Sequence, residues 1–175
     1  SSVPDGSLNT SIDQSITTDI NGIASAVVTT GTKTGTYTFL ASAANVTGTP
    51  VSFTLTANAG PPTTMTKNTA SDNQTGAVFT QLTSPLEVQI TDAGGNPVRG
   101  VPVIFANTVK PANATDPVIN PSTPITDVLG NAKANISLGN TSGTYKFTAT
   151  VNGLAGSPSE FTASAIAGAP YRMEL

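Results

Sequence analysis

The chain contains no cysteine, no histidine and no tryptophan, and only 10% of its residues are charged. Without cysteine and histidine it can form neither disulfide bonds nor zinc sites of the Cys/His type, and it has no Ser-His-Asp or Cys-His catalytic arrangement. An enzyme of this composition would depend on carboxylates, yet the 10 acidic residues are scattered and form no pair at a spacing typical of glycosidases. We therefore expect a protein without catalytic activity and without a cofactor.

Basic clusters and long hydrophobic runs are also missing. The net charge is −3, and no group of Lys and Arg residues could follow a phosphate backbone, so nucleic acid is not an expected partner. No apolar stretch approaches the roughly 20 residues that a membrane-spanning helix requires. The sequence therefore predicts that these residues do not span a membrane.

What the chain does contain is typical of an all-β protein. Its 16 Gly and 13 Pro, with many Thr and Ser, separate short runs in which apolar and polar residues alternate. Such alternation predicts strands with one buried face. The clearest runs are residues 86–90, 101–105, 132–138, 145–151 and 161–165. About seven short strands at this spacing predict a β-sandwich.

Two local patterns refine this prediction. The turn-forming residues 92–97 lie between the runs 86–90 and 101–105, so we expect these two runs to be neighbouring antiparallel strands. Residues 107–124 contain four prolines, which predict a long loop with at most a short edge strand near Val118.

A long part of the chain repeats itself 108 positions later without a gap. Thr18 and Asp19 return as Thr126 and Asp127, and the match continues as far as Met65 and Met173. This period is longer than the roughly 20 to 50 residues of solenoid and propeller repeats and suits a small domain. The repeat therefore predicts a tandem array of modules.

The phase of the repeat predicts where the modules begin and end. Residues 61–168 form one complete module, residues 1–60 the C-terminal part of a preceding one, and residues 169–175 the first strand of a following one. Because Ser1 corresponds to Val109, residues 1–60 have no counterpart of residues 61–108. We expect their core to be open unless strands arrive from the same chain or from an adjacent subunit.

The predicted core consists of the large apolar and aromatic residues that alternate along these runs. In the complete module and in residues 1–60 they are Val103, Phe105, Ile136, Tyr145, Phe147, Phe161, Tyr37 and Phe39.

Three separated blocks resemble one protein family. Residues 91–105, with the sequence TDAGGNPVRGVPVIF, followed by residues 126–132 and 143–149, resemble the signature of bacterial Ig-like domains of the invasin and intimin group, of the Big_1 type. The resemblance implies tandem Ig-like β-sandwich modules, the first of them incomplete in this chain. It also implies that Tyr145, and Tyr37 by the repeat, occupy the tyrosine-corner position of such sandwiches.

The same resemblance implies a function. It indicates a structural or adhesive repeat of an extracellular bacterial surface protein or filament, acting as a spacer or stalk, with neighbouring Ig-like modules and a host or cell-surface ligand as partners. Two alternatives remain open. One is a self-assembling filament subunit whose first module is completed by strands of the next chain, and the other is a glycan- or receptor-binding module or an accessory domain of a phage particle.

Calcium is the metal to consider in an extracellular tandem β-protein. Asp92, Asn96, Asp127 and Asn131 are candidate oxygen ligands because they lie in turns. Asx residues at turns commonly accept hydrogen bonds from their own backbone, and this is the interpretation that the sequence favours.

Overall fold

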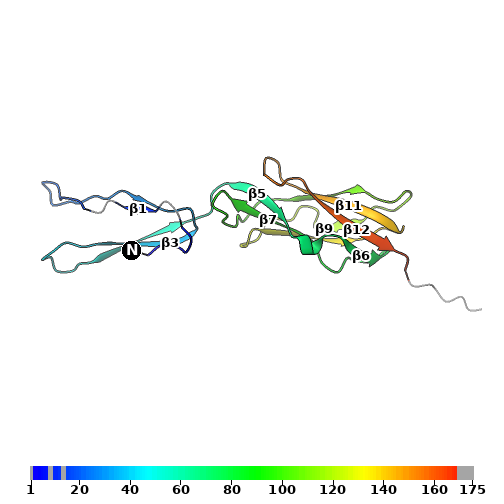
Figure 1. Ribbon diagram of the computed structural model, residues 1–175, viewed down its shortest axis with the longest axis horizontal. Helices are drawn as coiled ribbons and strands as arrows, with labels where there is room; N and C mark the ends of the chain where they lie inside the picture. Colours follow the sequence, from blue (N-terminus) through cyan, green and yellow to red (C-terminus); the bar gives the residue numbers. More distant parts are fainter. Residues whose placement is uncertain (1, 8–9, 13–14, 169–175) are drawn as a thin grey trace, which may run out of the picture. The chain divides into compact units, whose positions relative to one another are not determined.

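The computed structural model describes residues 2–7, 10–12 and 15–168. The predicted first strand of a following module, residues 169–175, lies outside them. The chain divides into two compact units, of which the first comprises Ser1–Gly60 with Gly94–Asn96 and the second comprises the other residues from Pro61 onward. Apart from one 3-10 turn, η1 (Thr69–Ser71), the regular elements of the described residues are strands (Figure 1).

The second unit is a sandwich of two four-stranded sheets. One sheet has the order β5-β7-β10-β9 and the other the order β6-β12-β11-β8. All neighbouring strands are antiparallel except β6 and β12, which are parallel. The strands are β5 (Pro62–Lys67), β6 (Gln74–Ala77), β7 (Leu86–Asp92), β8 (Ile104–Val109), β9 (Val118–Asn120), β10 (Asn131–Ser137), β11 (Gly143–Thr150) and β12 (Ser159–Ile166). The predicted all-β, Ig-like sandwich is confirmed.

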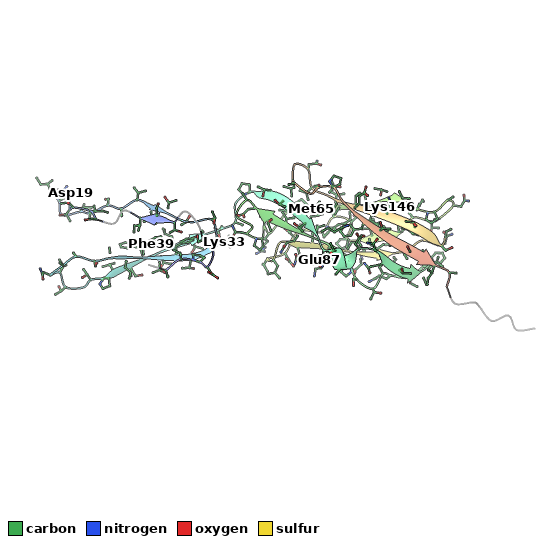
Figure 2. All side chains as sticks on the ribbon, in the orientation of Figure 1. Asp19, Lys33, Phe39, Met65, Glu87 and Lys146 are labelled. Carbon is green, nitrogen blue, oxygen red and sulfur yellow. The ribbon has the colours of Figure 1, made fainter. Side chains whose placement is uncertain are left out.

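The core of this unit is formed by side chains that alternate along the strands. In β7 and β10, and in β11 from Tyr145 and β12 from Phe161 onward, every second residue is buried, as a strand with one inward face requires. The rings of Phe105 and Phe161 lie 6.3 Å apart, and Met65 is buried within the same unit (Figure 2). The residues singled out from the sequence that lie in this core are Val103, Phe105, Ile136, Tyr145, Phe147 and Phe161.

The prediction that residues 86–90 and 101–105 are neighbouring antiparallel strands is wrong. Strand β7 pairs with β5 on one side and β10 on the other, whereas β8 pairs with β11 in the opposite sheet. Since both edges of β7 are occupied, the chain crosses to the other sheet after Asp92. Isolated bridges between Thr91 and Pro97 and between Pro102 and Ile125 fix this crossing.

Two further elements test the interpretation of the strand pattern. Strand β6 was missed by sequence reasoning because its residues Gln-Thr-Gly-Ala show no apolar alternation, and it is positioned by a distant parallel partner, β12. The proline-rich segment behaves as predicted, because β9 has only three residues and lies at the edge of its sheet.

The first unit contains two separate pairs of strands. Strand β1 (Ser11–Ile12) pairs with β2 (Val28–Thr29), and β3 (Gly35–Ala41) pairs with β4 (Val51–Ala57) (Figure 1). Phe39 lies opposite Phe53 in the second pair, just as Phe147 lies opposite Phe161 in β11 and β12. Within the described residues, the first unit therefore holds counterparts of β9 to β12 and none of β5 to β7.

In the part of the chain that the structure describes, no helix is long and apolar enough to cross a membrane.

Candidate functional site

Each unit contains the same tyrosine-based tie. The hydroxyl of Tyr145 donates a hydrogen bond to the carbonyl oxygen of Thr141 at 2.9 Å, and the hydroxyl of Tyr37 donates to the carbonyl oxygen of Lys33 at 2.7 Å. Both rings are fully buried. The hydroxyl of each tyrosine thus fixes the segment that enters its strand, which is the role of a tyrosine corner.

Each unit also repeats one aspartate-centred turn. The Asp127 carboxylate accepts the N–H groups of Leu129 at 2.8 Å and Asn131 at 2.9 Å. In the first unit, Asp19 accepts the corresponding N–H groups at 2.8 and 2.9 Å. The hydrogen bond from the N–H of Ile23 is the main cause that lowers the pKa of Asp19. These carboxylates stabilise their own turns.

The four candidate calcium ligands have different surroundings. Asp127 is engaged by its turn, and Asp92 and Asn96 are buried. The Asn96 amide accepts one main-chain hydrogen bond at 3.1 Å and donates another at 2.8 Å, while Asn131 lines a polar hollow on the sheet. Among the described residues, no three Asp, Glu, His or Cys side chains gather as a metal site. Capping accounts for Asp127, and calcium binding by these residues stays a prediction.

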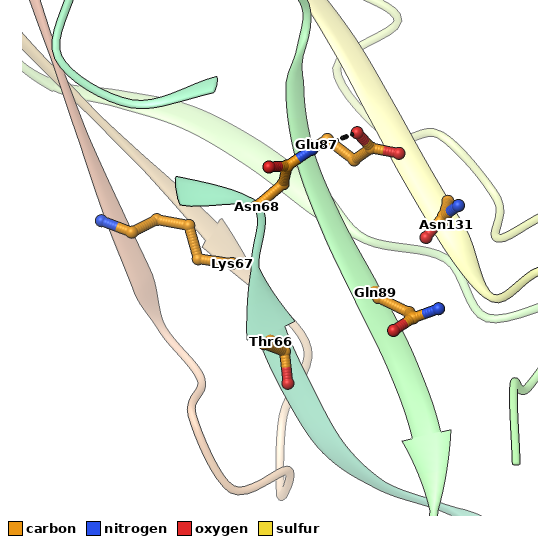
Figure 3. A pocket seen from close by; sticks show the side chains of 6 residues that line it. All are labelled: Thr66, Lys67, Asn68, Glu87, Gln89 and Asn131. Carbon is orange, nitrogen blue, oxygen red and sulfur yellow. Dashed lines mark hydrogen bonds between the residues drawn. The ribbon is translucent and has the colours of Figure 1, made fainter. Parts of the chain in front are cut away.

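The polar hollow occupies about 310 Å³ on the face of β5, β7 and β10 (Figure 3). Its lining residues are Thr66, Lys67, Asn68, Glu87, Gln89 and Asn131. The Asn68 amide donates to Glu87 at 2.7 Å, and Glu87 also pairs with Lys133 at 3.1 Å. This lining has no aromatic side chain on which a sugar ring could stack. The acidic group of the hollow is thus already paired within the protein.

A carboxylate–ammonium pair links β5 to β12, and sequence reasoning missed it. Asp72 accepts hydrogen bonds from the Lys67 ammonium at 2.5 Å and from the Thr162 N–H at 2.8 Å. Lys67 also donates to the carbonyl oxygen of Glu160 at 2.7 Å and lies 5.3 Å from the centre of the Phe161 ring. The short separation of Lys67 and Asp72 around η1 is the only signal of this pair in the sequence.

The environment of Asp72 has opposing effects on its pKa. Burial of the carboxyl group, taken alone, would raise the pKa. The hydrogen bond and positive charge of Lys67, together with the N–H groups of Thr162 and Asn73, outweigh burial and hold the pKa below its ordinary value. Asp72 is therefore a charged structural link between strands of different sheets.

The first unit has an apolar groove of about 620 Å³. Its walls come from both strand pairs and from the segment that leads into β2. The lining residues are Ile12, Ile16, Ala24, Ala26, Val28, Phe39, Leu40, Ala41, Ser42, Phe53 and Leu55. Phe53 is 56% exposed, and Leu40 and Leu55 are exposed as well. A contiguous apolar surface of this kind typically marks a site of polypeptide contact.

No protein-family model matches the chain, and no curated protein matches it. Among solved structures, the chain is similar to the adhesin InvE of Yersinia pseudotuberculosis, with 16% identity and a TM-score of 0.45 over 93% of this chain and 50% of that one. Invasin, a bacterial integrin-binding protein, is 21% identical with a TM-score of 0.45, over 86% of this chain and 28% of that one. The D0-D1 domain of intimin is 19% identical with a TM-score of 0.39, over 91% and 76%.

The chain thus spans half of the length of InvE and less than a third of that of invasin. Invasin and intimin are the group that residues 91–105, 126–132 and 143–149 resemble.

Proposed function

We propose that the chain is a repeated structural Ig-like segment of an extracellular, adhesive bacterial surface protein or filament, where it serves as a spacer or stalk. The observation that carries this proposal is that the same set of structural features occurs in both units. The tyrosine tie, the aspartate turn and the register of the final hairpin all recur 108 positions apart. Serial copies of one module are suited to holding another part of the protein at a set distance from the cell surface.

The interior of the second unit supports this function. Its buried side chains come from both of its own sheets, so each complete module can be stable through its own core. Its ion pairs join neighbouring strands or turns of the same unit. In this function the partners are neighbouring Ig-like modules, and the location is the outside of the bacterial cell.

Single-molecule force spectroscopy of the whole chain tests the stalk function. A stalk module should resist tension and then unfold in one step. Releasing the 108 residues of the complete module (168 − 61 + 1) should lengthen the chain by on the order of 350 Å, because an extended residue spans about 3.3 to 3.6 Å. Gradual extension without this step would contradict a stalk that transmits tension.

A binding assay separates the stalk from the glycan- or receptor-binding alternative. Fluorescently labelled chain is applied to a glycan array and to host cells over a wide concentration range. A spacer segment should give no saturable binding, because it holds a binding site away from the cell rather than forming one. Saturable binding that unlabelled chain competes away would favour the alternative.

A further inference from the structure

We propose that Asn152 is a site of spontaneous deamidation, and that its isoaspartate product loosens the loop that covers the outer edge of β5. This inference concerns a chemical modification of the second unit, and it does not depend on the stalk function. The reactive pair is Asn152-Gly153, in the loop between β11 and β12. The chain has one other Asn-Gly pair, Asn21-Gly22, and the structure places the two pairs in different surroundings.

Deamidation of an Asn-Gly pair needs no enzyme and no cofactor, because asparagine is chemically labile in water. The main-chain nitrogen of the glycine attacks the side-chain carbonyl carbon of the asparagine. The new C–N bond closes a five-membered succinimide ring, and the amide group leaves as ammonia with the proton of the attacking nitrogen. Water then opens the ring at either carbonyl group and leaves aspartate or isoaspartate. Glycine favours ring closure because it has no side chain to hinder the approach.

The surroundings of Asn152 leave this reaction unhindered. Asn152 and Gly153 are both exposed, and among the described residues no group accepts a hydrogen bond from the main-chain N–H of Gly153. The φ angle of Gly153 is 81°, and no atom lies within 4 Å of a Cβ atom built on it. The nitrogen of Gly153 is therefore free to lose its proton, and the ring can form without a collision.

The Asn21-Gly22 pair lies in a turn that holds the attacking nitrogen. The N–H of Gly22 donates to the carbonyl oxygen of Asp19 at 3.0 Å. The carboxylate of Asp19 accepts two further main-chain N–H groups of the same turn. Attack by the nitrogen of Gly22 would break the first of these hydrogen bonds and disturb the other two, at a cost in free energy. The structure therefore favours reaction at Asn152 over reaction at Asn21.

The loop that contains Asn152 covers the edge of β5 that does not pair with β7. The N–H of Ala155 donates to the carbonyl oxygen of Thr63 at 2.9 Å, and the carbonyl oxygen of Ala155 accepts the N–H of Met65 at 2.8 Å. Gly156 passes so close to β5 that an added Cβ atom would lie 2.2 Å from the carbonyl oxygen of Met65.

Isoaspartate at position 152 would change both the length and the charge of this loop. The main chain of isoaspartate passes through the side-chain carbon, so it is longer by one methylene group. The carboxylate that remains is charged at neutral pH. A longer chain between β11 and Ala155 no longer matches the close fit to β5, so we expect the two hydrogen bonds of Ala155 to open more often.

The first test incubates the full chain in warm, mildly alkaline buffer and follows each asparagine by peptide mapping with mass spectrometry. We expect deamidation at Asn152 to be several-fold faster than at Asn21 and to yield isoaspartate. The rate should rise with pH, because the attacking nitrogen must lose its proton. A folded chain in which Asn152 stays intact, or reacts no faster than Asn21, would overturn the proposal.

The same chain in urea is the control for the sequence around each pair. Both asparagines follow a β-branched residue, Ile20 or Val151, so the two rates should become similar once the turns are unfolded. A difference that persists in urea would come from the flanking residues, and the structural explanation would be wrong.

Two variants separate the chemistry from its effect on the loop. Asn152→Gln keeps an amide but would have to close a less favourable six-membered ring, so position 152 should stay unmodified during the same incubation. Freshly prepared Asn152→Asp carries the charge of the product on a main chain of ordinary length.

Hydrogen exchange at the amides of Met65 and Ala155 measures the effect. We expect exchange at both amides to be faster in the incubated chain than in the fresh chain, and to be close to that of the fresh chain in both variants. If the incubated chain exchanges as slowly as the fresh one, or if Asn152→Asp exchanges as fast as the incubated chain, isoaspartate does not loosen the loop and this part of the proposal is wrong.

Discussion

Phe53 and Phe161 occupy the same place in two copies of one hairpin, yet Phe53 is 56% exposed and Phe161 is completely buried. Each lies opposite a phenylalanine of the preceding strand, Phe39 for Phe53 and Phe147 for Phe161. The difference arises because β6 and the opposite sheet enclose β12 in the second unit, whereas β4 has only β3 beside it among the described strands. Corresponding phenylalanines of one hairpin register thus form a core in one unit and an apolar surface in the other.

Substitution of these two phenylalanines should have unequal effects. Phe161→Ala should lower the free energy of unfolding of the second unit by about 3 to 5 kcal/mol, because it creates a cavity in a packed core. Phe53→Ala removes the same atoms from an exposed position and should cost less than about 1 kcal/mol. Urea unfolding of both variants measures the difference. Equal losses would mean that Phe53 is enclosed in solution.

The tyrosine tie should make a measurable contribution to stability. Tyr145→Phe keeps the buried ring and removes only the hydroxyl that donates to Thr141. We expect a loss of about 0.5 to 1.5 kcal/mol, the net value of one hydrogen bond. Chemical denaturation of the variant and of the original chain measures this loss. An unchanged free energy of unfolding would show that the tie contributes nothing.

Two glycines of one loop should respond differently to an added methyl group. Gly153 and Gly156 have similar positive φ angles, 81° and 82°, so alanine introduces comparable backbone strain at both. Only at Gly156 does the new Cβ overlap the carbonyl oxygen of Met65; at Gly153 nothing lies within 4 Å. Gly156→Ala should therefore be about 1 to 3 kcal/mol more destabilising than Gly153→Ala. Thermal unfolding of the two variants compares them, and equal midpoints would argue against close packing of this loop on β5.

Asp72 should make the second unit sensitive to acid. Its pKa in the folded protein is lowered, so below the unfolded pKa of about 3.9 the unfolded chain binds more protons than the folded one. The stabilisation is complete above that pH and is lost as the pH falls through the lower, folded pKa. Asp72→Asn should therefore flatten the dependence of unfolding free energy on pH in this acidic range.

Asp116 provides the control for this experiment. It also pairs with a lysine at 2.5 Å, but its side chain is 85% exposed, so the pair is well screened by water. Asp116→Asn should leave the acid dependence close to that of the original chain. If both variants behave alike, the Lys67–Asp72 pair is not the source of the acid sensitivity.

The aspartate turn should function without metal. Asp127→Ala removes the acceptor of two main-chain N–H groups and should lower the stability of the second unit by about 1 kcal/mol. Addition of a chelator, or of calcium, should leave the melting temperature of the original chain unchanged. A calcium-dependent rise that Asp127→Ala abolishes would instead identify Asp127 as a calcium ligand.

The sequence by itself determined the β class, the tandem repeat and most strands of the second unit. The strand and turn signals are local. They depend on residues a few positions apart, such as the alternation along β7, β10, β11 and β12 and the residues of each turn. The resemblance of residues 143–149 to the Ig-like signature implied the tyrosine tie, which is itself local, because Tyr145 bonds to a residue only four positions away.

Only the tertiary structure decided which strands pair, and therefore which surfaces are covered. Strand β8 joins the sheet opposite β7, and β6 forms beside the distant β12, because strand pairing depends on which edges the rest of the chain leaves open. The pairing of Lys67 and Asp72 with β12 is likewise long-range. Burial of Phe161 and exposure of Phe53 follow from the same cause, because a hairpin of the same register is enclosed only where other strands pack against it.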